Sequence, residues 1–339
     1  MAARGAGTTP TEPSHAEMKA VRLYETGDVG VLRYEDAPVP TPGPGQALVR
    51  LRASGVNFVD IYQRTGLNPL PLPAVLGGEG AGVVEAVAPD VTEVAPGDRV
   101  AYTNVPGSYA EFVVAPAWRL VPLPDGCDFT QAAAVMLQGM TAHYLTHTTY
   151  PLRPGEWALV HAAAGGVGAL LVQMAKRRGA RVIATVSTEE KAAVARAAGA
   201  DVCVIYTRED FREAVQRATE GAGVQVVYDS VGRDTFERGL ESLALRGMMV
   251  LYGQASGPVH PLDPRVLNTK GSLFLTRPSL HHYTHTRAEL LGRAGDVLTW
   301  VREGTLKLRI DRTFPLAEAA AAHSRLEGRA ALGKILLIP

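Results

Sequence analysis

The spacing of hydrophobic and polar positions changes along the chain. Between residues 18 and 130, short apolar, β-prone runs at 19–23, 47–53 and 82–87 alternate with clusters of proline and glycine. The segment 39–45 holds three prolines and two glycines, and such a segment forms a loop. This pattern predicts a compact, barrel-like β-rich unit with little helix.

After about residue 130, strand and helix periods alternate. Strands are predicted at 157–161, 181–186, 201–206, 224–230, 248–252 and 272–276, with helices at 168–178, 189–198, 208–220 and 234–245. Glycines at 179, 199 and 221 follow three of these helices and are well placed to end them. Six strands with intervening helices predict an α/β fold, a doubly wound parallel sheet of the Rossmann, dinucleotide-binding type.

The last 60 residues do not extend this alternation. A helix at 287–303, a strand at 306–314, a helix at 316–326 and a strand at 334–338 are predicted there. We expect these pieces to return to the first unit. The predicted domains are therefore 18–138 with 278–339, and 139–277, preceded by a disordered tail at 1–17.

Composition narrows the classes of function. Thirty-four basic residues balance thirty-four acidic ones, so charge gives no reason to expect nucleic acid or an anionic membrane as the main partner. No apolar run approaches the roughly 20 residues of a spanning helix, and residues 1–17 lack the apolar region of a signal peptide. The two cysteines, Cys127 and Cys203, form no CxxC pair, which argues against an all-cysteine zinc lobe and favours the reducing cytoplasm.

The strongest chemical signal is the run HAAAGGVG at residues 161–168, between a predicted strand and a predicted helix. Against the pattern GxGxxG, Ala163 replaces the first glycine, while Gly165 and Gly168 fit. The middle glycine lets the backbone approach a pyrophosphate, and the last allows the helix to pack closely on the strand. An empty glycine-rich turn is the alternative, but the repeated βα units favour nucleotide binding.

The following strand discriminates between the two nicotinamide dinucleotides. An enzyme for NAD usually carries an acidic residue there to bind the ribose 2′-hydroxyl, and the segment 184–188 has none. Lys191 and Tyr206 are placed to bind a 2′-phosphate instead, which predicts NADPH. Ser187 and Glu190 also form a plausible capping box at this helix start.

Several short sequence motifs, taken together, are similar to those of one family. They are GVNFVDIY at 55–62, LGGEGAG at 76–82, the run at 161–168, VYDSVG at 227–232, LNTKGSL at 267–273 and LLIP at 336–339. From Met18 to the end, the chain resembles the quinone oxidoreductase and zeta-crystallin branch of the zinc-free medium-chain dehydrogenase/reductase superfamily. The resemblance implies a GroES-like catalytic domain beside the Rossmann domain, NADPH as cofactor and a homodimer.

The resemblance also shows where the chain departs from zinc-dependent alcohol dehydrogenases. Asn57 stands where those enzymes have a cysteine ligand, and Gly78 stands where they have a histidine ligand, next to Glu79. A catalytic zinc site would lack its ligands here, so no metal is expected. Without a Lewis acid, the carbonyl of the acceptor must be polarised by hydrogen bonds or be reactive already, and quinones and enones suit that demand.

Further contacts are implied residue by residue. The cofactor would be bound by Asn57, Phe58, Val59, Thr141, Ala163, Ala164, Gly165, Gly166, Val167, Lys191, Tyr206, Ser230, Tyr252, Gly253, Gln254, Ala255, Phe274, Leu275, Thr276 and Arg329. Gln254 and Ala255 depart from the Asn and Ser common in relatives. Asn57 and Tyr62 are the candidate catalytic residues facing the quinone, with Tyr62 able to donate a hydrogen bond to the developing oxyanion. A partly buried aromatic role for Tyr62 stays open.

Other interpretations are weighed against quinone reduction. One is NADPH-dependent reduction of α,β-unsaturated ketones or aldehydes, and another is an NADPH-binding protein of crystallin type without important turnover. Asp60 resembles a general base but is expected to fix the local turn or pair with a basic side chain. His281 and His285 belong to a segment, 281–285, that is as rich in histidine as some metal sites, although a surface segment is the favoured interpretation.

Overall fold

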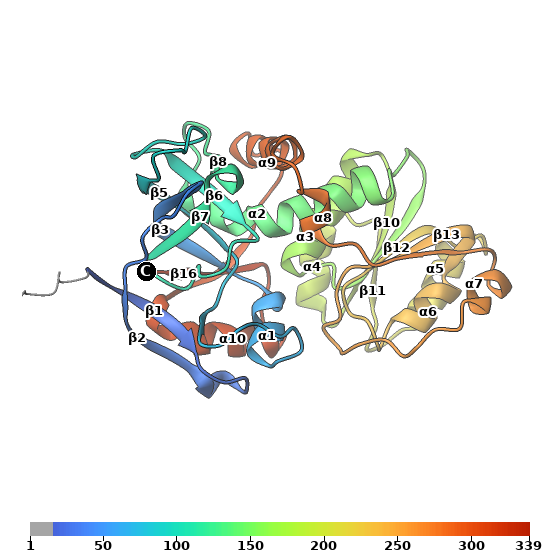
Figure 1. Ribbon diagram of the computed structural model, residues 1–339. Helices are drawn as coiled ribbons and strands as arrows, with labels where there is room; N and C mark the ends of the chain where they lie inside the picture. Colours follow the sequence, from blue (N-terminus) through green and yellow to red (C-terminus); the bar gives the residue numbers. More distant parts are fainter. Residues whose placement is uncertain (1–15) are drawn as a thin grey trace, which may run out of the picture.

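The computed structural model describes residues 16–339. Most of the predicted tail, 1–17, therefore lies outside the described residues, and Glu17 already begins the first strand. The predicted α/β class is confirmed: Figure 1 shows a β-rich part beside a parallel sheet flanked by helices.

Two sheets make up the β-rich part. The smaller has the order β2-β1-β4, and the larger has the order β15-β16-β3-β5-β6-β8, with β7 pairing β3. The strands are β1 Glu17–Leu23, β2 Leu32–Pro38, β3 Gln46–Val56, β4 Ala74–Val75, β5 Glu79–Val87, β6 Arg99–Thr103, β7 Phe112–Pro116, β8 Val121–Pro122, β15 Ile310–Pro315 and β16 Lys334–Ile338. β3 is the central strand because it pairs with β5, β7 and β16.

The second part is a six-stranded parallel sheet of order β11-β10-β9-β12-β13-β14. Its strands are β9 Trp157–Val160, β10 Arg181–Val186, β11 Val202–Ile205, β12 Val224–Asp229, β13 Leu243–Leu251 and β14 Phe274–Thr276. The strand order reverses between β9 and β12, and ligands of such sheets bind at the carboxyl ends of the strands at that point. β14 forms one edge of the sheet.

The helices are α1 Phe58–Arg64, α2 Phe129–Tyr144, α3 Gly166–Arg177, α4 Glu189–Ala197, α5 Phe211–Ala218, α6 Phe236–Glu241, α7 Arg265–Thr269, α8 Leu280–Tyr283, α9 Arg287–Arg302 and α10 Ala319–Glu327. Some of the helices cover the parallel sheet, α2 links it to the β-rich part, and others, such as α1 and α10, pack within the β-rich part. A turn of π-helix, Leu145–Thr149, continues α2.

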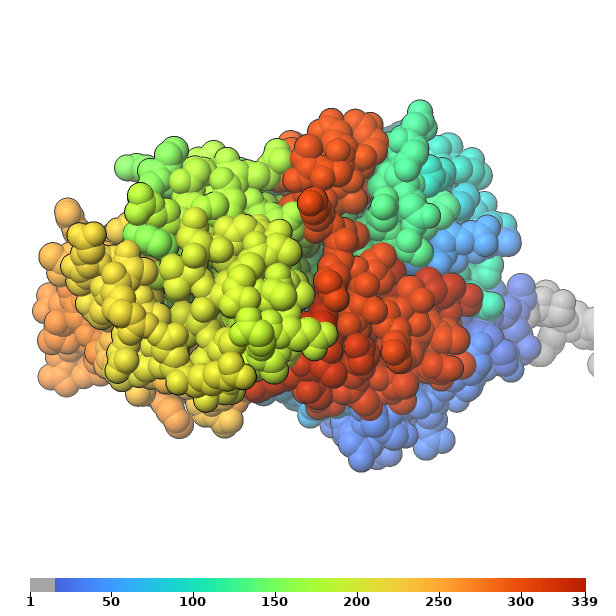
Figure 2. Space-filling model, turned by 180° about the vertical axis from the view of Figure 1, so that it is seen from behind, coloured from blue at the N-terminus to red at the C-terminus, as the bar shows by residue number. Residues whose placement is uncertain are grey.

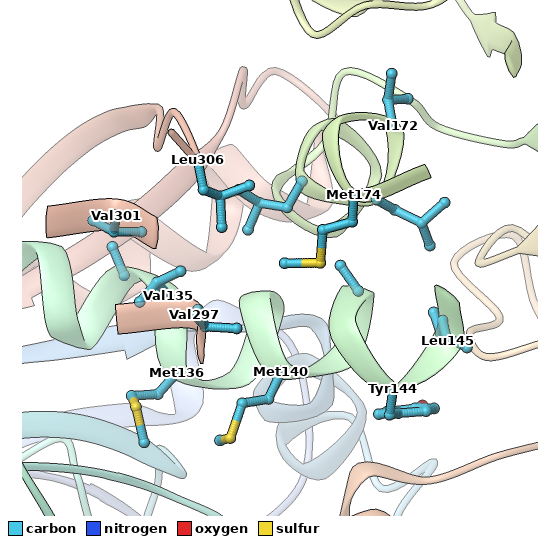
Figure 3. Close-up of a cluster of buried hydrophobic side chains, with 14 of the residues drawn as sticks. Val135, Met136, Met140, Tyr144, Leu145, Val172, Met174, Val297, Val301 and Leu306 are labelled. Carbon is cyan, nitrogen blue, oxygen red and sulfur yellow. The ribbon is translucent and has the colours of Figure 1, made fainter. Parts of the chain in front are cut away.

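Helix α2 joins the two parts. In Figure 3 its side chains Val135, Met136 and Met140 project from α2, with Met174 of α3 and Val297 of α9 in the same buried cluster. All five are fully buried. Burying apolar surface on several sides of one helix fixes the two parts against each other.

The C-terminal strand β16 lies in the larger sheet of the β-rich part. β16 pairs antiparallel with β3, with Ile335 opposite Val56, and Figure 2 shows the red C-terminal segments at the junction of the two parts. The predicted boundaries at 138/139 and 277/278 stay predictions, and the first of them falls inside α2.

Several predicted elements have different bounds in the structure. The helix predicted at 208–220 is shorter because Asp210 caps α5 by accepting a hydrogen bond from the backbone N–H of Arg212. The helix predicted at 234–245 stops at Glu241, since Leu243–Leu251 forms one long strand, whose register shifts between its pairings with Val224 and Val226. Among residues 16–339, no helix is long and apolar enough to cross a bilayer.

Candidate functional site

A cleft of about 940 Å³ runs along the carboxyl ends of the parallel strands and reaches the β-rich part. Its wall includes most of the predicted cofactor residues: Asn57, Phe58, Val59, Thr141, Ala164, Gly165, Gly166, Val167, Lys191, Tyr206, Ser230, Tyr252, Gly253, Gln254, Ala255 and Arg329, together with Tyr62. The fold therefore gathers residues from both ends of the sequence around one elongated cavity.

Four predicted cofactor residues do not line this cleft in the described chain. Ala163 is fully buried beneath the glycine turn. Phe274, Leu275 and Thr276 lie on the edge strand β14, where Phe274 is 56% exposed and Leu275 is 38% exposed. Their contacts with a cofactor stay predictions.

The glycine turn forms an open cradle at the start of α3. Gly165 is the N-cap and offers no side-chain cap, so the first N–H groups of the helix are left for a ligand. A Cβ at Gly166 would overlap the Gln138 side chain, and a Cβ at Gly168 would overlap the Ala162 carbonyl. Ala162 itself adopts φ of 52°, an uncommon conformation for a residue with a side chain. The turn thus fits a phosphate group through its backbone.

A basic side chain lies at the other side of this turn. The Lys191 ammonium donates to Ser187 Oγ at 3.1 Å and to the Arg329 carbonyl at 2.9 Å, which joins α4 to the C-terminal segment. Burial and the neighbouring Arg329 lower the pKa of Lys191. Tyr206, 45% exposed, lines the same end of the cleft. The Lys191 ammonium and the Arg329 guanidinium thus place two positive charges at one end of the cavity, and these favour a phosphate there.

The predicted capping box at α4 is wrong by one residue. Thr188, not Ser187, is the N-cap, and its hydroxyl accepts from the backbone N–H of Lys191 at 3.3 Å. Ser187 is instead a partner of the Lys191 ammonium. Ser187 and Thr188 both carry hydroxyls that can cap a helix, so the sequence does not distinguish them. The backbone conformation decides which hydroxyl faces the start of the helix.

The opposite end of the cleft carries Asn57 and Tyr62. Asn57 is 4% exposed and is the N-cap residue of α1, and its side chain is held at the cleft wall by hydrogen bonds to Glu79 and Lys334. The Tyr62 hydroxyl accepts from the backbone N–H of Gln254 at 3.4 Å, and burial raises the pKa of Tyr62. The phenol therefore stays protonated near neutrality, and its proton is available to a ligand.

Asp60 fixes the turn that carries Asn57, as expected. Its Oδ2 accepts from the Asn57 backbone N–H and from the Tyr109 hydroxyl, each at 2.8 Å. Burial raises the pKa of Asp60 to about 7. Because Asp60 does not line the cleft, it orients Asn57 and does not act as a general base on a ligand.

Sequence reasoning missed several wall residues. Tyr144 stacks on Tyr283 with ring centroids 4.2 Å apart, and Gln138 lies against Gly166. The Arg277 guanidinium donates to the Gln254 side-chain oxygen at 3.0 Å near Tyr62. Arg277 directly follows the predicted strand at 272–276. This position at the carboxyl end of a strand could have indicated that Arg277 lines the cleft.

The histidine-rich segment 281–285 is not part of any group of three or more potential metal-ligand side chains among residues 16–339. His281 contacts Arg119, and His285 pairs with Glu289 at 2.7 Å on the surface. Both contacts suit the favoured interpretation of a surface segment.

Comparisons with known proteins agree with this geometry. The chain matches the alcohol dehydrogenase GroES-like domain over residues 43–125 and the zinc-binding dehydrogenase family over residues 166–285. It is 47% identical to a quinone oxidoreductase of Pseudomonas aeruginosa, covering 95% of this chain and 99% of that protein. It is 44% identical to a 2-haloacrylate reductase of a Burkholderia species, covering 94% and 98%.

A solved structure extends the likeness to three dimensions. The Escherichia coli quinone oxidoreductase complexed with NADPH superimposes with a TM-score of 0.93 at 42% identity, covering 95% of this chain and all of that one. Sequence identity at this level over nearly the whole chain confirms the resemblance to quinone oxidoreductases that the short sequence motifs indicated. The chain belongs to the quinone oxidoreductase family of the medium-chain dehydrogenases and reductases.

Proposed function

We propose that this protein is an NADPH-dependent quinone oxidoreductase that works without zinc. The observation that carries the proposal is the single cleft that joins the glycine turn and Lys191 at one end to Asn57 and Tyr62 at the other. A dinucleotide bound by its phosphates at the turn would extend along this cleft toward Tyr62. The relatives named for quinone reduction support the same acceptor.

The residues present fit NADPH. The N–H groups at the start of α3 would hold the pyrophosphate, and Lys191 with Arg329 would hold the 2′-phosphate. No carboxylate stands on the segment 186–188 at the end of β10, where it would repel that phosphate. These contacts favour NADPH over NADH.

When bound, NADPH supplies the hydride, and the chain supplies position and polarity. Tyr62 would donate a hydrogen bond to the oxygen of the acceptor that gains negative charge. Asn57 and Gly78 stand in place of the cysteine and histidine ligands of the zinc enzymes, and neither offers the thiolate or imidazole that zinc prefers. Acceptors with delocalised products, such as quinones, suit a site of this composition.

The test is steady-state kinetics with NADPH and 1,4-benzoquinone after treatment with a chelator. We expect turnover to survive the chelator, and Tyr62→Phe to lower kcat about tenfold, which corresponds to the loss of one hydrogen bond of about 1.4 kcal/mol. Tyr34→Phe is the matched control, because Tyr34 is exposed on β2, away from the cleft. Turnover that disappears with the metal, or a Tyr62→Phe variant as fast as the parent, would contradict the respective part of the proposal.

A second acceptor class is favoured by Arg277. Burial raises the pKa of Tyr62, and the Arg277 guanidinium lies close enough to that phenol to oppose part of the rise, so it adds a positive charge to this end of the cleft. An unsaturated carboxylate would complement that charge, and the Burkholderia relative is named for 2-haloacrylate reduction. Parallel assays with 1,4-benzoquinone, a neutral enone and 2-chloroacrylate separate these acceptors. Tight NADPH binding with a negligible rate on all of them would favour the crystallin-type role.

We also propose a homodimer formed through the edge strand β14. Phe274 is 56% exposed there and Leu245 of the neighbouring strand is 79% exposed, which leaves an apolar patch beside an unpaired strand edge. Pairing the two edges across a two-fold axis would cover both. Light scattering should give twice the chain mass, and Leu245→Glu with Phe274→Glu should give the monomer; a parent that is monomeric at micromolar concentration would refute this.

The thiols Cys127 and Cys203 are free, which supports a reducing cytoplasmic location.

A further inference from the structure

A buried ion pair lies directly behind Asn57. Lys334 at the start of β16 and Glu79 at the start of β5 are both completely buried, and their charged groups are 2.5 Å apart. The Lys334 ammonium also donates to Asn57 Oδ1 at 2.7 Å, and the Asn57 Nδ2 donates to Glu79 Oε2 at 2.9 Å. Three side chains from distant parts of the sequence thus form a closed hydrogen-bonded triangle.

The chemistry of the triangle permits one orientation of the Asn57 amide. An ammonium only donates hydrogen bonds and a carboxylate only accepts them, so Oδ1 must face Lys334 and Nδ2 must face Glu79. The reversed amide would set donor against donor and acceptor against acceptor. The second N–H of Asn57 points to the Gly55 carbonyl at 3.3 Å.

The surroundings are built to hold this triangle. The other carboxylate oxygen of Glu79 accepts from the backbone N–H of Leu137 at 2.5 Å, which ties the triangle to α2. A Cβ at position 55 would overlap the Glu79 carboxylate, so Gly55 makes room for it. Burying two charges costs several kcal/mol per ion before their attraction is counted, and apolar side chains of similar volume often stabilise a fold as well. Stability alone is therefore a weak reason for the pair.

We propose that Lys334 is a positioning residue that locks the Asn57 amide and makes Asn57 a hydrogen-bond acceptor toward the ligand. Both N–H groups of Asn57 are committed to Glu79 and Gly55, and only a lone pair of Oδ1 remains for a group in the cleft. Asn57 then orients an N–H or O–H group at the reacting end of the cleft, and the donor to the acceptor oxygen is Tyr62. This inference rests on the proposed function and refines the part that Asn57 plays in it.

The first test separates orientation from stability. Lys334→Met alone leaves the Glu79 carboxylate unpaired and should lower the Tm strongly. Glu79→Gln with Lys334→Met removes both charges, which should restore most of the Tm, but the introduced glutamine amide can accept or donate and no longer fixes the Asn57 amide. We expect kcat with 1,4-benzoquinone to stay about 10- to 100-fold below the parent while the KM for NADPH changes less than about threefold, the size expected for losing one charge-assisted hydrogen bond. Recovery of kcat together with the Tm would reduce the pair to a structural role.

The second test asks whether Lys334 acts through Asn57. In an Asn57→Ala background, the same double substitution should cost no further kcat, whereas losses that multiply would overturn the coupling. Asn57→Asp with Glu79→Gln keeps one buried carboxylate beside Lys334 and keeps an acceptor at position 57. We expect this swap to be at least about tenfold faster than Asn57→Ala, and a swap as slow as Asn57→Ala would show that Asn57 acts as a donor.

A readout without turnover distinguishes this inference from the proposed function. In the ¹⁵N-labelled protein, the side-chain NH₂ protons of Asn57 should exchange with water slowly in the parent and at least about tenfold faster in the Glu79→Gln, Lys334→Met variant. A parent that exchanges slowly yet reduces no quinone would refute the proposed function alone. Equal exchange rates in parent and variant would refute the lock.

Discussion

Replacing Lys191 by alanine should change the choice between the two nicotinamide coenzymes. The ammonium already donates to Ser187 Oγ and to the Arg329 carbonyl, so one of its three N–H groups is left for a ligand. One hydrogen bond between charged groups is worth about 1.5–3 kcal/mol, or roughly 10- to 100-fold in affinity. We expect Lys191→Ala to weaken NADPH binding by that factor and NADH binding less than about threefold, because NADH has no 2′-phosphate.

Isothermal titration calorimetry with both coenzymes measures this difference directly. Lys176→Ala is the matched control: Lys176 lies on the neighbouring helix α3, pairs with Asp201 at 2.7 Å and is not part of the cleft wall. It should leave both affinities unchanged. Equal losses for NADPH and NADH in Lys191→Ala would refute the assignment of Lys191 to the 2′-phosphate.

Three further predictions concern packing and titration. Gly168→Ala places a Cβ against the Ala162 carbonyl and should destabilise the fold by about 1–3 kcal/mol and weaken NADPH binding, measured by denaturant unfolding and calorimetry, whereas Gly292→Ala in the open on α9 should not destabilise. Asp60 has a pKa raised to about 7 from 3.8, so its charging opposes folding and stability should fall as pH rises from about 4 to 7, by up to about 4 kcal/mol; Asp60→Asn should flatten this slope in pH-dependent unfolding. Burial lowers the pKa of His147 to about 4, so its contribution is present above pH 6.5 and is lost as pH falls toward 4; His147→Gln should reduce this acid loss, and an unchanged acid limb would refute it.

Local periodicity predicted much of the nucleotide-binding half. The strand at 181–186 has the predicted bounds, as does the strand at 334–338 of the β-rich part, because β-prone side chains between clear breakers leave few alternatives. The glycine turn also lies where the pattern placed it, between β9 and α3. A turn whose glycines are required by backbone contacts is readable from a few residues.

Elements determined by tertiary packing were not predictable in this way. Helix α2 is buried on several sides, so its alanines and methionines give no amphipathic stripe. The Lys334–Glu79 pair joins positions 255 residues apart, and nothing near either residue marks it as buried. The edge position of Phe274 and Leu275 likewise depends on how the strands are ordered.

The most direct test of the whole account is a single-turnover experiment. Enzyme treated with a chelator and loaded with NADPH is mixed rapidly with 1,4-benzoquinone, and the loss of the reduced nicotinamide absorbance is followed with ordinary and C4-deuterated NADPH. We predict rapid oxidation of one NADPH per cleft, slowed by deuterium at the transferred position. Oxidation no faster than that of free NADPH, or a reaction that requires added zinc, would contradict the account.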